Sequence, residues 1–326
     1  MIRFAIEKAN HVLVIAHIDP DGDAIGSLTA MGQAMQQLGK RVLLVCDDPV
    51  PERFLYLPLA GEVRRMPRTD TSYDLVIAVD CADESRMGWA FESLPEPKPS
   101  VANFDHHVTN TRFGAFNIVD HEAGSTAEVL HRFLIETGVA LTPGIAASLL
   151  TGIVTDTIGF RTTNVTSATL RAAADLVDAG GDIADISLRA LHQKPFIAAQ
   201  MWGIGLSRLK TEAGGLHWTS FPREELQRAG IEGNPSSSGL VNFLIDIESA
   251  VMAVVLTEMT DGTVRVTMRS QPPYNVAEVA TQFGGGGHAL AAGCTLDGPL
   301  DRAESLLIDA CRAALRRQAT PLPLVS

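Results

Sequence analysis

Short apolar runs alternate with helical stretches along the first half of this chain, and that order restricts the folds open to it. The first run, residues 12–17 (VLVIAH), precedes a helical pattern from Ala24 to Leu38, and a second run follows at Arg41–Cys46. Further apolar runs lie at Leu75–Asp80 and Val101–Phe104. Strand, helix and strand in this order, joined by short links, are typical of a doubly wound, mainly parallel α/β sheet.

The second half of the chain has a different character. Two β-rich runs, Ala250–Glu258 and Thr263–Arg269, flank an Asp-Gly pair at 261–262, which is a strong hairpin signal. An amphipathic helix is expected over Asp301–Arg317. A chain of 326 residues is long enough for two domains. We therefore expect a first domain over 1–187, a helical linker over 188–210, and a smaller α/β domain with a mixed sheet over 211–326.

The charge balance restricts the partners. The net charge is −12, from 38 acidic and 26 basic residues, whereas proteins that follow long DNA or RNA usually carry a basic face. Long duplex DNA is therefore not expected as a partner, but small phosphorylated ligands remain open because metal ions can offset clustered acids. The four cysteines form no CxxC pair, and neither a signal peptide nor an apolar run of membrane-spanning length is evident. We expect a soluble, cytoplasmic protein without a membrane partner.

Acidic and histidine side chains follow the apolar runs. They are His17, Asp19, Asp21 and Asp23 in HIDPDGD, Asp80 in VIAVDC, Asp105, His106 and His107 in NFDHH, and Asp156 in GIVTDTIGF. Because ligands bind at the carboxyl edge of open α/β sheets, these groups should converge on one crevice. So many acids need cations among them, and a mixed imidazole and carboxylate set suits Mn, Fe, Co or Zn. More than four ligands indicate two ions bridged by a carboxylate such as Asp80, and hydrolysis of a phosphoester.

Structural interpretations of the same residues stay open. A single Asp after a strand is more often a helix cap or a turn former than a ligand, and this applies to Asp19 and Asp105. The glycine run at 284–287 lets the backbone approach a phosphate or a base and offers N–H donors. Arg269 and His288 add positive charge and a donor. The same glycines are also compatible with a purely structural turn.

Five segments of the sequence resemble the motifs of one family. HIDPDGDAIGS, AVDC, DHH and LLTGIVTDTIGF are similar, in order, to the four motifs of the DHH phosphoesterases. VTMRSQPPYNVAEVATQFGGGGHALAAG resembles the DHHA1 domain that accompanies them. The length and the tandem arrangement are most similar to the family's bifunctional oligoribonuclease and 3′-phosphoadenosine-5′-phosphate phosphatase group. The resemblance implies a DHH catalytic domain, a helical linker and a DHHA1 substrate-binding domain.

The resemblance also implies roles for individual residues. Two divalent ions would be bound, with Mn²⁺ preferred and Mg²⁺ or Co²⁺ as alternatives. His17 and Asp21 would hold one ion, and Asp23, His106 and Asp156 would hold the other. Asp80 would bridge the two ions. His107 would face the scissile phosphate as a hydrogen-bond or proton donor, and Asp105 would orient a histidine. The implied substrate-binding residues, across an interdomain cleft, are Arg269, Ser270, Asn275, Gly285, Gly286, Gly287 and His288.

The activity that the resemblance implies is hydrolysis by a hydroxide activated between two metal ions. Short oligoribonucleotides would be degraded to mononucleotides, and 3′-phosphoadenosine-5′-phosphate would be converted to AMP. Alternatives are a phosphodiesterase for cyclic di-AMP or linear pApA, a RecJ-like single-strand exonuclease, and a nucleotide-binding regulator without catalysis. A homodimer is expected only because dimers are the commonest oligomers.

Overall fold

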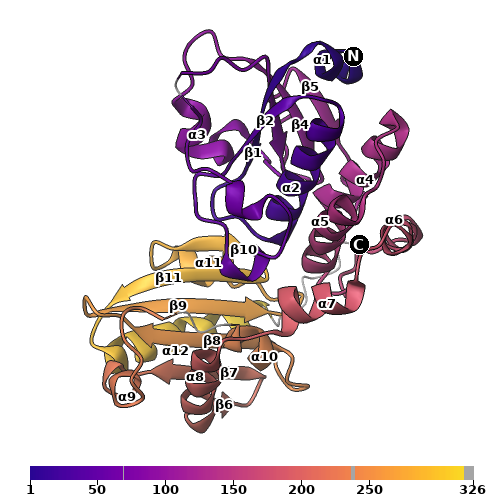
Figure 1. Cartoon of the computed structure of the whole chain (residues 1–326). Coiled ribbons are helices and arrows are strands. Elements are labelled where there is room, and N and C mark those ends of the chain that lie inside the picture. The colour runs from indigo at the N-terminus through magenta and orange to yellow at the C-terminus, as the bar shows by residue number, and fades with distance from the viewer. Residues whose placement is uncertain (69, 236–238, 319–326) are drawn as a thin grey trace, which may run out of the picture. The chain divides into compact units, whose positions relative to one another are not determined.

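A computed structural model describes residues 1–68, 70–235 and 239–318 of the chain (Figure 1). The chain divides into two compact units, Met1–Gln193 and Lys194–Ser326. Residues 188–210, expected as a linker, comprise a helical turn, a helix and the start of a strand. In the described part of the chain, no helix combines the length and the apolar character that a membrane crossing requires.

The first unit is built on a parallel sheet. Its strands are β1 (His11–Ala16), β2 (Arg41–Val45), β3 (Leu75–Val79), β4 (Ser100–Asp105) and β5 (Phe116–Val119). They lie in the order β2-β1-β3-β4-β5, and each neighbouring pair is parallel. This is the doubly wound arrangement predicted from the strand–helix alternation.

Helices and helical turns connect these strands. They are α1 (Ile2–Lys8), α2 (Gly22–Gln37), η1 (Glu52–Phe54), η2 (Ala60–Glu62), η3 (Glu84–Met87), α3 (Gly88–Glu92), α4 (Thr126–Thr137), α5 (Pro143–Asp156), α6 (Ser167–Asp178), α7 (Ile183–Ser187) and η4 (Leu188–His192).

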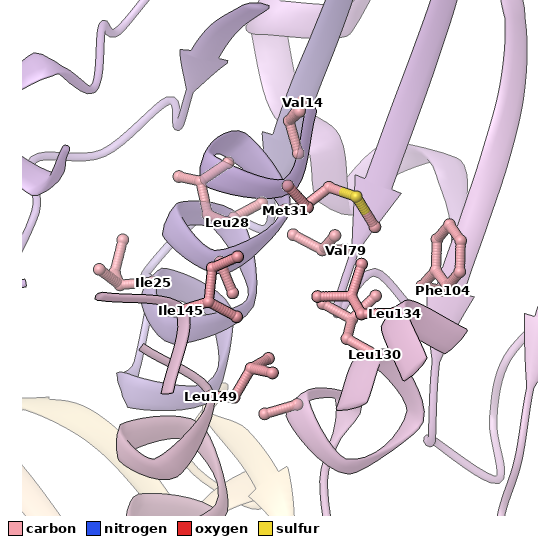
Figure 2. Packing of buried hydrophobic residues seen from close by; sticks show 14 of the residues in the cluster. Val14, Ile25, Leu28, Met31, Val79, Phe104, Leu130, Leu134, Ile145 and Leu149 are labelled. Atoms are coloured by element: carbon pink, nitrogen blue, oxygen red, sulfur yellow. The ribbon is translucent and has the colours of Figure 1, made fainter. Parts of the chain in front are cut away.

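Both faces of the parallel sheet are covered, because successive side chains of a strand point to opposite faces. Val14 of β1 points to the face covered by α2, α4 and α5, together with Val79 and Phe104 of the neighbouring strands (Figure 2). Leu13 and Ile15 belong to the opposite cluster, with residues of α3. Burial on both faces explains why these strands are continuous apolar runs in the sequence.

The second unit contains a mixed sheet, as expected. Its strands are β6 (Lys210–Glu212), β7 (Leu216–Phe221), β8 (Met252–Glu258), β9 (Thr263–Ser270), β10 (Gly286–His288) and β11 (Ala291–Asp297). Their order is β10-β11-β9-β8-β7-β6, with β7 and β8 parallel and the other pairs antiparallel. The helices are α8 (Phe196–Ser207), α9 (Arg223–Arg228), α10 (Leu240–Ile245), α11 (Ala277–Thr281) and α12 (Leu300–Gln318).

Two local predictions for this unit are confirmed. The Asp-Gly pair at 261–262 joins β8 and β9 in a hairpin, with Gly262 at a φ of 82° that suits glycine. The amphipathic helix is α12, and its buried residues pack on β7, β8 and β9. On the other face of the sheet, α8 and α10 pack against Phe221 and Val255. The helix α8 therefore belongs to the core of this unit.

Candidate metal centre

The edge of the parallel sheet where strand order reverses carries the first acidic and histidine residues. β1 and β3 are neighbours, but the chain leaves them in opposite directions, to β2 and to β4, and ligands bind at such points. His17 follows β1 and Asp80 follows β3. The Nε2 atom of His17 lies 3.4 Å from a carboxylate oxygen of Asp80. Asp80 has a left-handed φ of 61°, which costs a non-glycine residue about 1–2 kcal/mol and is concentrated at functional sites.

His17, Asp21 and Asp80 form a first group whose potential ligand atoms all lie within 4.8 Å of one another. Asp21 also caps α2, because its Oδ1 atom accepts hydrogen bonds of 3.0 Å from the backbone N–H groups of Asp23 and Ala24. Its side chain is 54% exposed and lies 3.9 Å from Nε2 of His17. The capping role and a place beside the histidine therefore belong to the same carboxylate.

Asp23, His106 and Asp156 form a second group with the same spacing. Asp23 lies in the first turn of α2, Asp156 ends α5, and Nε2 of His106 lies 3.4 Å from a carboxylate oxygen of Asp156. A third group contains Asp80, His106 and His107. Asp80 thus adjoins residues of both main groups, which is the position expected for a carboxylate between two ions.

The two histidines of these groups are held by backbone carbonyls. The Nδ1 atom of His17 lies 2.6 Å from the oxygen of Ile18, and that of His106 lies 3.3 Å from the oxygen of Ala123. An Nδ1–H that donates to a carbonyl leaves the Nε2 lone pair directed at the acids, as metal ligation requires. Nη2 of Arg86 is also 2.9 Å from Nδ1 of His17. A protonated Nδ1 cannot accept that hydrogen bond, so only the carbonyl contact is compatible with ligation through Nε2.

The N-terminus of α4 holds two of the acids. The carboxylate of Asp23 accepts hydrogen bonds from the backbone N–H groups of Thr126 at 2.6 Å and Ala127 at 2.9 Å. The hydroxyl of Thr126 donates to Asp80 at 2.8 Å. The positive end of a helix dipole favours these anions. Sequence analysis missed Thr126, because nothing about a single threonine in the sequence marks it as a partner of acids elsewhere in the chain.

The proton affinities show how crowded these acids are. Burial raises the pKa of Asp23 well above its usual value, and the charges of Asp80 and Asp156 raise it further. Burial and the charges of Asp80 and Asp21 raise the pKa of Asp156 to about 6. Burial also disfavours ionised Asp80, but the hydrogen bond and charge of His17 outweigh it and bring its pKa to about 2. A crowded set of oxygen and imidazole donors fits divalent cations, which supply the missing positive charge.

His107 differs from the other two site histidines. Its Nδ1 atom lies 2.7 Å from the fully buried carboxylate of Asp105, and its side chain is 42% exposed. The hydrogen bond to Asp105 raises the pKa of His107 to about 9, against the effect of burial and with help from the charge of Asp80.

Asp19 is outside the three groups. Its backbone N–H donates to Asp48 and its φ is 54°.

The expected substrate-binding side chains lie in the second unit. Arg269 of β9 is half-buried, and burial lowers the pKa of its guanidinium. Among the described residues, Arg269 makes no ion pair with a carboxylate. Ser270 and Asn275 have local partners: the Ser270 hydroxyl donates to the oxygen of Tyr274, and the Asn275 amide oxygen caps α11.

The glycine run forms a strand end, β10, paired with β11. A Cβ atom at Gly285 would lie 2.2 Å from the oxygen of Gly293, and one at Gly287 would lie 2.5 Å from that of Ala291. A side chain at either position would therefore collide with β11. A Cβ at Gly286 would meet nothing within 4 Å, and His288 is exposed. Gly284 and Gly286 of the run, and His288 after it, are exposed, and no described residue lies close to a Cβ at either of these two glycines in the way of a ligand.

Comparison with known proteins covers both units. Residues 11–153 match the DHH family, N-terminal domain, and residues 230–316 match the DHHA1 domain. A Thermus thermophilus protein named bifunctional oligoribonuclease and PAP phosphatase NrnA is 36% identical over 94% of this chain and 90% of its own length. The Bacillus subtilis protein of the same name is 25% identical over 91% of this chain and 93% of its own length.

A solved structure extends the likeness to the fold. An exopolyphosphatase-related protein from Bacteroides fragilis aligns with a TM-score of 0.89 and 21% identity, covering 98% of this chain and 96% of its own.

Proposed function

The chain belongs to the DHH family of phosphoesterases and carries a DHHA1 domain, and on that premise we propose that it hydrolyses short nucleotide phosphoesters with two bound Mn²⁺ ions. Its substrates are short oligoribonucleotides, which it degrades to mononucleotides, and 3′-phosphoadenosine-5′-phosphate, from which it releases AMP. A cytoplasmic location and a homodimer accompany this proposal as predictions.

The observation that carries the proposal is the position of Asp80. Its carboxylate adjoins the group of His17 and Asp21 as well as His106, which belongs to the group of Asp23 and Asp156. A bridging carboxylate between two ligand sets is typical of two-metal hydrolases that act on phosphoesters. The names of the relatives from Thermus thermophilus and Bacillus subtilis support the choice of substrates.

Bound divalent ions would activate water and neutralise charge on the phosphate. The chain orients at least four of the expected ligands. Carbonyl oxygens direct Nε2 of His17 and His106 toward the acids, and the first turn of α4 holds Asp23 and Asp80. His107, oriented by Asp105, supplies a hydrogen bond or a proton to the leaving oxygen.

In the second unit, Arg269, His288 and the backbone at Gly286 bind the phosphate or the base of the substrate. The support is chemical. Arg269 is a half-buried cation without a carboxylate partner among the described residues, and Gly286 has open space where a side chain would stand. A few cationic contacts in a chain of net charge −12 suit a short substrate better than a long polymer.

Product analysis tests the proposed substrates. The protein is incubated with Mn²⁺ and a 5′-phosphorylated RNA trimer in one tube and 3′-phosphoadenosine-5′-phosphate in another, and the products are separated by chromatography. Release of AMP from both supports the bifunctional activity. Intact substrates in both tubes overturn it, and cyclic dinucleotides become the next substrates to test.

A matched pair of arginines tests the role of the second unit. Arg265 and Arg269 lie four residues apart on β9, so both point to the same face of the sheet. Arg269→Gln should raise KM by about 10-fold or more, because a hydrogen bond to a charged group contributes about 1.5–3 kcal/mol of binding free energy. Arg265→Gln, at an exposed position, should leave KM unchanged. Equal effects of the two substitutions would argue against a specific contact at Arg269.

A further inference from the structure

Asn110 is a side chain near the candidate metal centre to which sequence analysis assigned no role. Its amide oxygen accepts hydrogen bonds from the backbone N–H of Arg112 at 2.7 Å and from the side chain of Asn103 at 3.2 Å. A backbone N–H is only a donor, so this contact fixes which end of the Asn110 amide is oxygen. The NH₂ group therefore faces the other way and donates to Asp105 at 2.5 Å and to the oxygen of Cys81 at 3.0 Å.

Asp105 is held mainly between two partners, and the hydroxyl of Thr126 is a third donor at 3.5 Å. One carboxylate oxygen accepts from Asn110, and the other accepts from Nδ1 of His107 at 2.7 Å. The carboxylate is completely buried, so it depends on these partners in place of water. A buried carboxylate that is fixed in this way fixes the ring that it binds.

The result for His107 is a defined tautomer and orientation. Nδ1 carries the proton shared with Asp105, so Nε2 is the nitrogen that can hold a second proton and pass it on, and the side chain is 42% exposed. The same arrangement of a buried carboxylate, a histidine and a reacting atom orients the general base or acid in other hydrolases.

We propose that Asn110 is a positioning residue, which holds Asp105 so that His107 presents its Nε2 proton to the leaving oxygen of the substrate. The inference rests on the proposed phosphoesterase function. In the step concerned, water adds to phosphorus and loses a proton to solvent. The bond between phosphorus and the leaving oxygen breaks with its electron pair on that oxygen. The oxygen takes the proton from Nε2, and His107 regains a proton from solvent.

A structural role for Asn110 makes a different prediction. If Asn110 only fastened its own loop, through Arg112, to the carbonyl of Cys81, its loss would slow all substrates alike. If it acts through His107, its loss slows those substrates whose leaving oxygen needs a proton. Two esters with the same nucleotidyl phosphorus separate these cases. The dinucleotide pApA expels a ribose 3′-oxygen, whereas the p-nitrophenyl ester of AMP expels nitrophenolate, which is stable without a proton.

The experiment compares kcat/KM for the two esters in Mn²⁺-loaded enzyme. Asn110→Ala should lower the value for pApA by about 100-fold and that for the nitrophenyl ester by less than about 3-fold, because general acid catalysis contributes about 10²–10⁴-fold where it is needed. In a His107→Ala background, the same substitution should add no more than about 2-fold for pApA, since residues that act as one unit are not additive.

The control is Asn117→Ala. Asn117 makes a reciprocal pair of hydrogen bonds with Gly114 in the segment that follows Asn110 and touches neither Asp105 nor His107 through any hydrogen bond between described residues. It should lower kcat/KM for the two esters equally or for neither. Should Asn110→Ala fail to fold, the isosteric Asp105→Asn takes its place and should show the same selectivity for pApA.

Each outcome has a separate meaning. Equal losses on both esters, or an unreduced effect in the His107→Ala background, overturn the positioning role while the proposed function stands. Wild-type enzyme that leaves pApA and the RNA trimer intact overturns the proposed function, and the positioning role falls with it.

Discussion

At the scale of single residues, the site depends most on Asp80. It is buried and takes a left-handed backbone conformation. Its carboxylate lies near His17 and also near His106 and His107. Thr126 supplies a hydrogen bond that holds it in place. No other residue in the described part of the chain belongs both to the His17 group and to a group with His106.

Asp80→Asn should abolish tight metal binding and lower kcat by more than about 100-fold, since loss of a residue that merely supports a ligand already costs about 10–100-fold. Mn²⁺ titration calorimetry and turnover of pApA measure the two effects. Asp74→Asn is the matched control. Asp74 precedes the same strand at its other end and accepts from the N–H groups of Asn10 and His11. It should keep metal affinity and lose about 1 kcal/mol of stability. Normal Mn²⁺ binding by Asp80→Asn would refute the bridging role.

Metal affinity should rise with pH. The pKa of Asp156 is raised to about 6, and the hydrogen bond and charge of Asp80 raise that of His17 in spite of its burial. Both groups ligate only when deprotonated, so protons compete with the metal below about pH 6 and are released when it binds. Calorimetry in buffers of different ionisation enthalpy should show more protons released at pH 6 than at about pH 8. Asp156→Asn should reduce that difference, and pH-independent affinity would contradict the ligand assignment.

At the scale of elements, the contact between α2 and α5 positions two of the acids. The helices approach closely at two glycines. A Cβ at Gly26 would lie 2.4 Å from the oxygen of Ser148, and one at Gly152 would lie 2.5 Å from a carboxylate oxygen of Asp23. The packing that joins the helices therefore also determines where Asp23 stands.

Gly152→Ala should lower the free energy of unfolding by about 1–3 kcal/mol through overpacking, and should weaken metal binding because Asp23 must move. Urea denaturation and Mn²⁺ calorimetry measure these effects. Gly203→Ala in α8 is the control, since its Cβ would meet nothing within 4 Å. It should stabilise the protein by about 0.5–1 kcal/mol by replacing a helical glycine. Unchanged metal affinity in Gly152→Ala would contradict the claim that the packing of α2 on α5 determines the position of Asp23.

At the scale of the whole molecule, the chain consists of two units with separate hydrophobic cores. The clusters around the parallel sheet contain residues of the first unit, and those around the mixed sheet contain residues of the second. The three ligand groups lie within the first unit. Clustered carboxylates repel one another without cations, so metal should stabilise this unit in particular.

Hydrogen exchange with Mn²⁺ and with chelator tests this expectation. Mn²⁺ at 100 times its Kd should add about 2.7 kcal/mol to the stability of the first unit, with slower exchange in α4, α5 and the carboxyl ends of β1, β3 and β4. Amides of the mixed sheet should exchange at the same rate in both conditions. Equal protection throughout the chain, or none, would contradict a metal site confined to the first unit.

The sequence by itself determined four strands of the parallel sheet in the first unit, the Asp-Gly hairpin and the identity of the residues that gather at the sheet edge, whereas β5 and β11 were not predicted. The predicted features follow from apolar periodicity and from residue types, which are local properties. The strand at Gly286–His288 escaped prediction, because glycines have no side chains to show a period of two.

Only the tertiary structure decided which partners hold the site residues. Thr126 donates hydrogen bonds to Asp23, 103 positions away in the chain, and to Asp80, 46 positions away. Asn110 donates one to Asp105, five positions before it. A threonine or an asparagine looks the same in the sequence whether it faces solvent or a buried carboxylate. Its hydrogen bonds depend on how strands and helices pack, and that packing exists only in the folded chain.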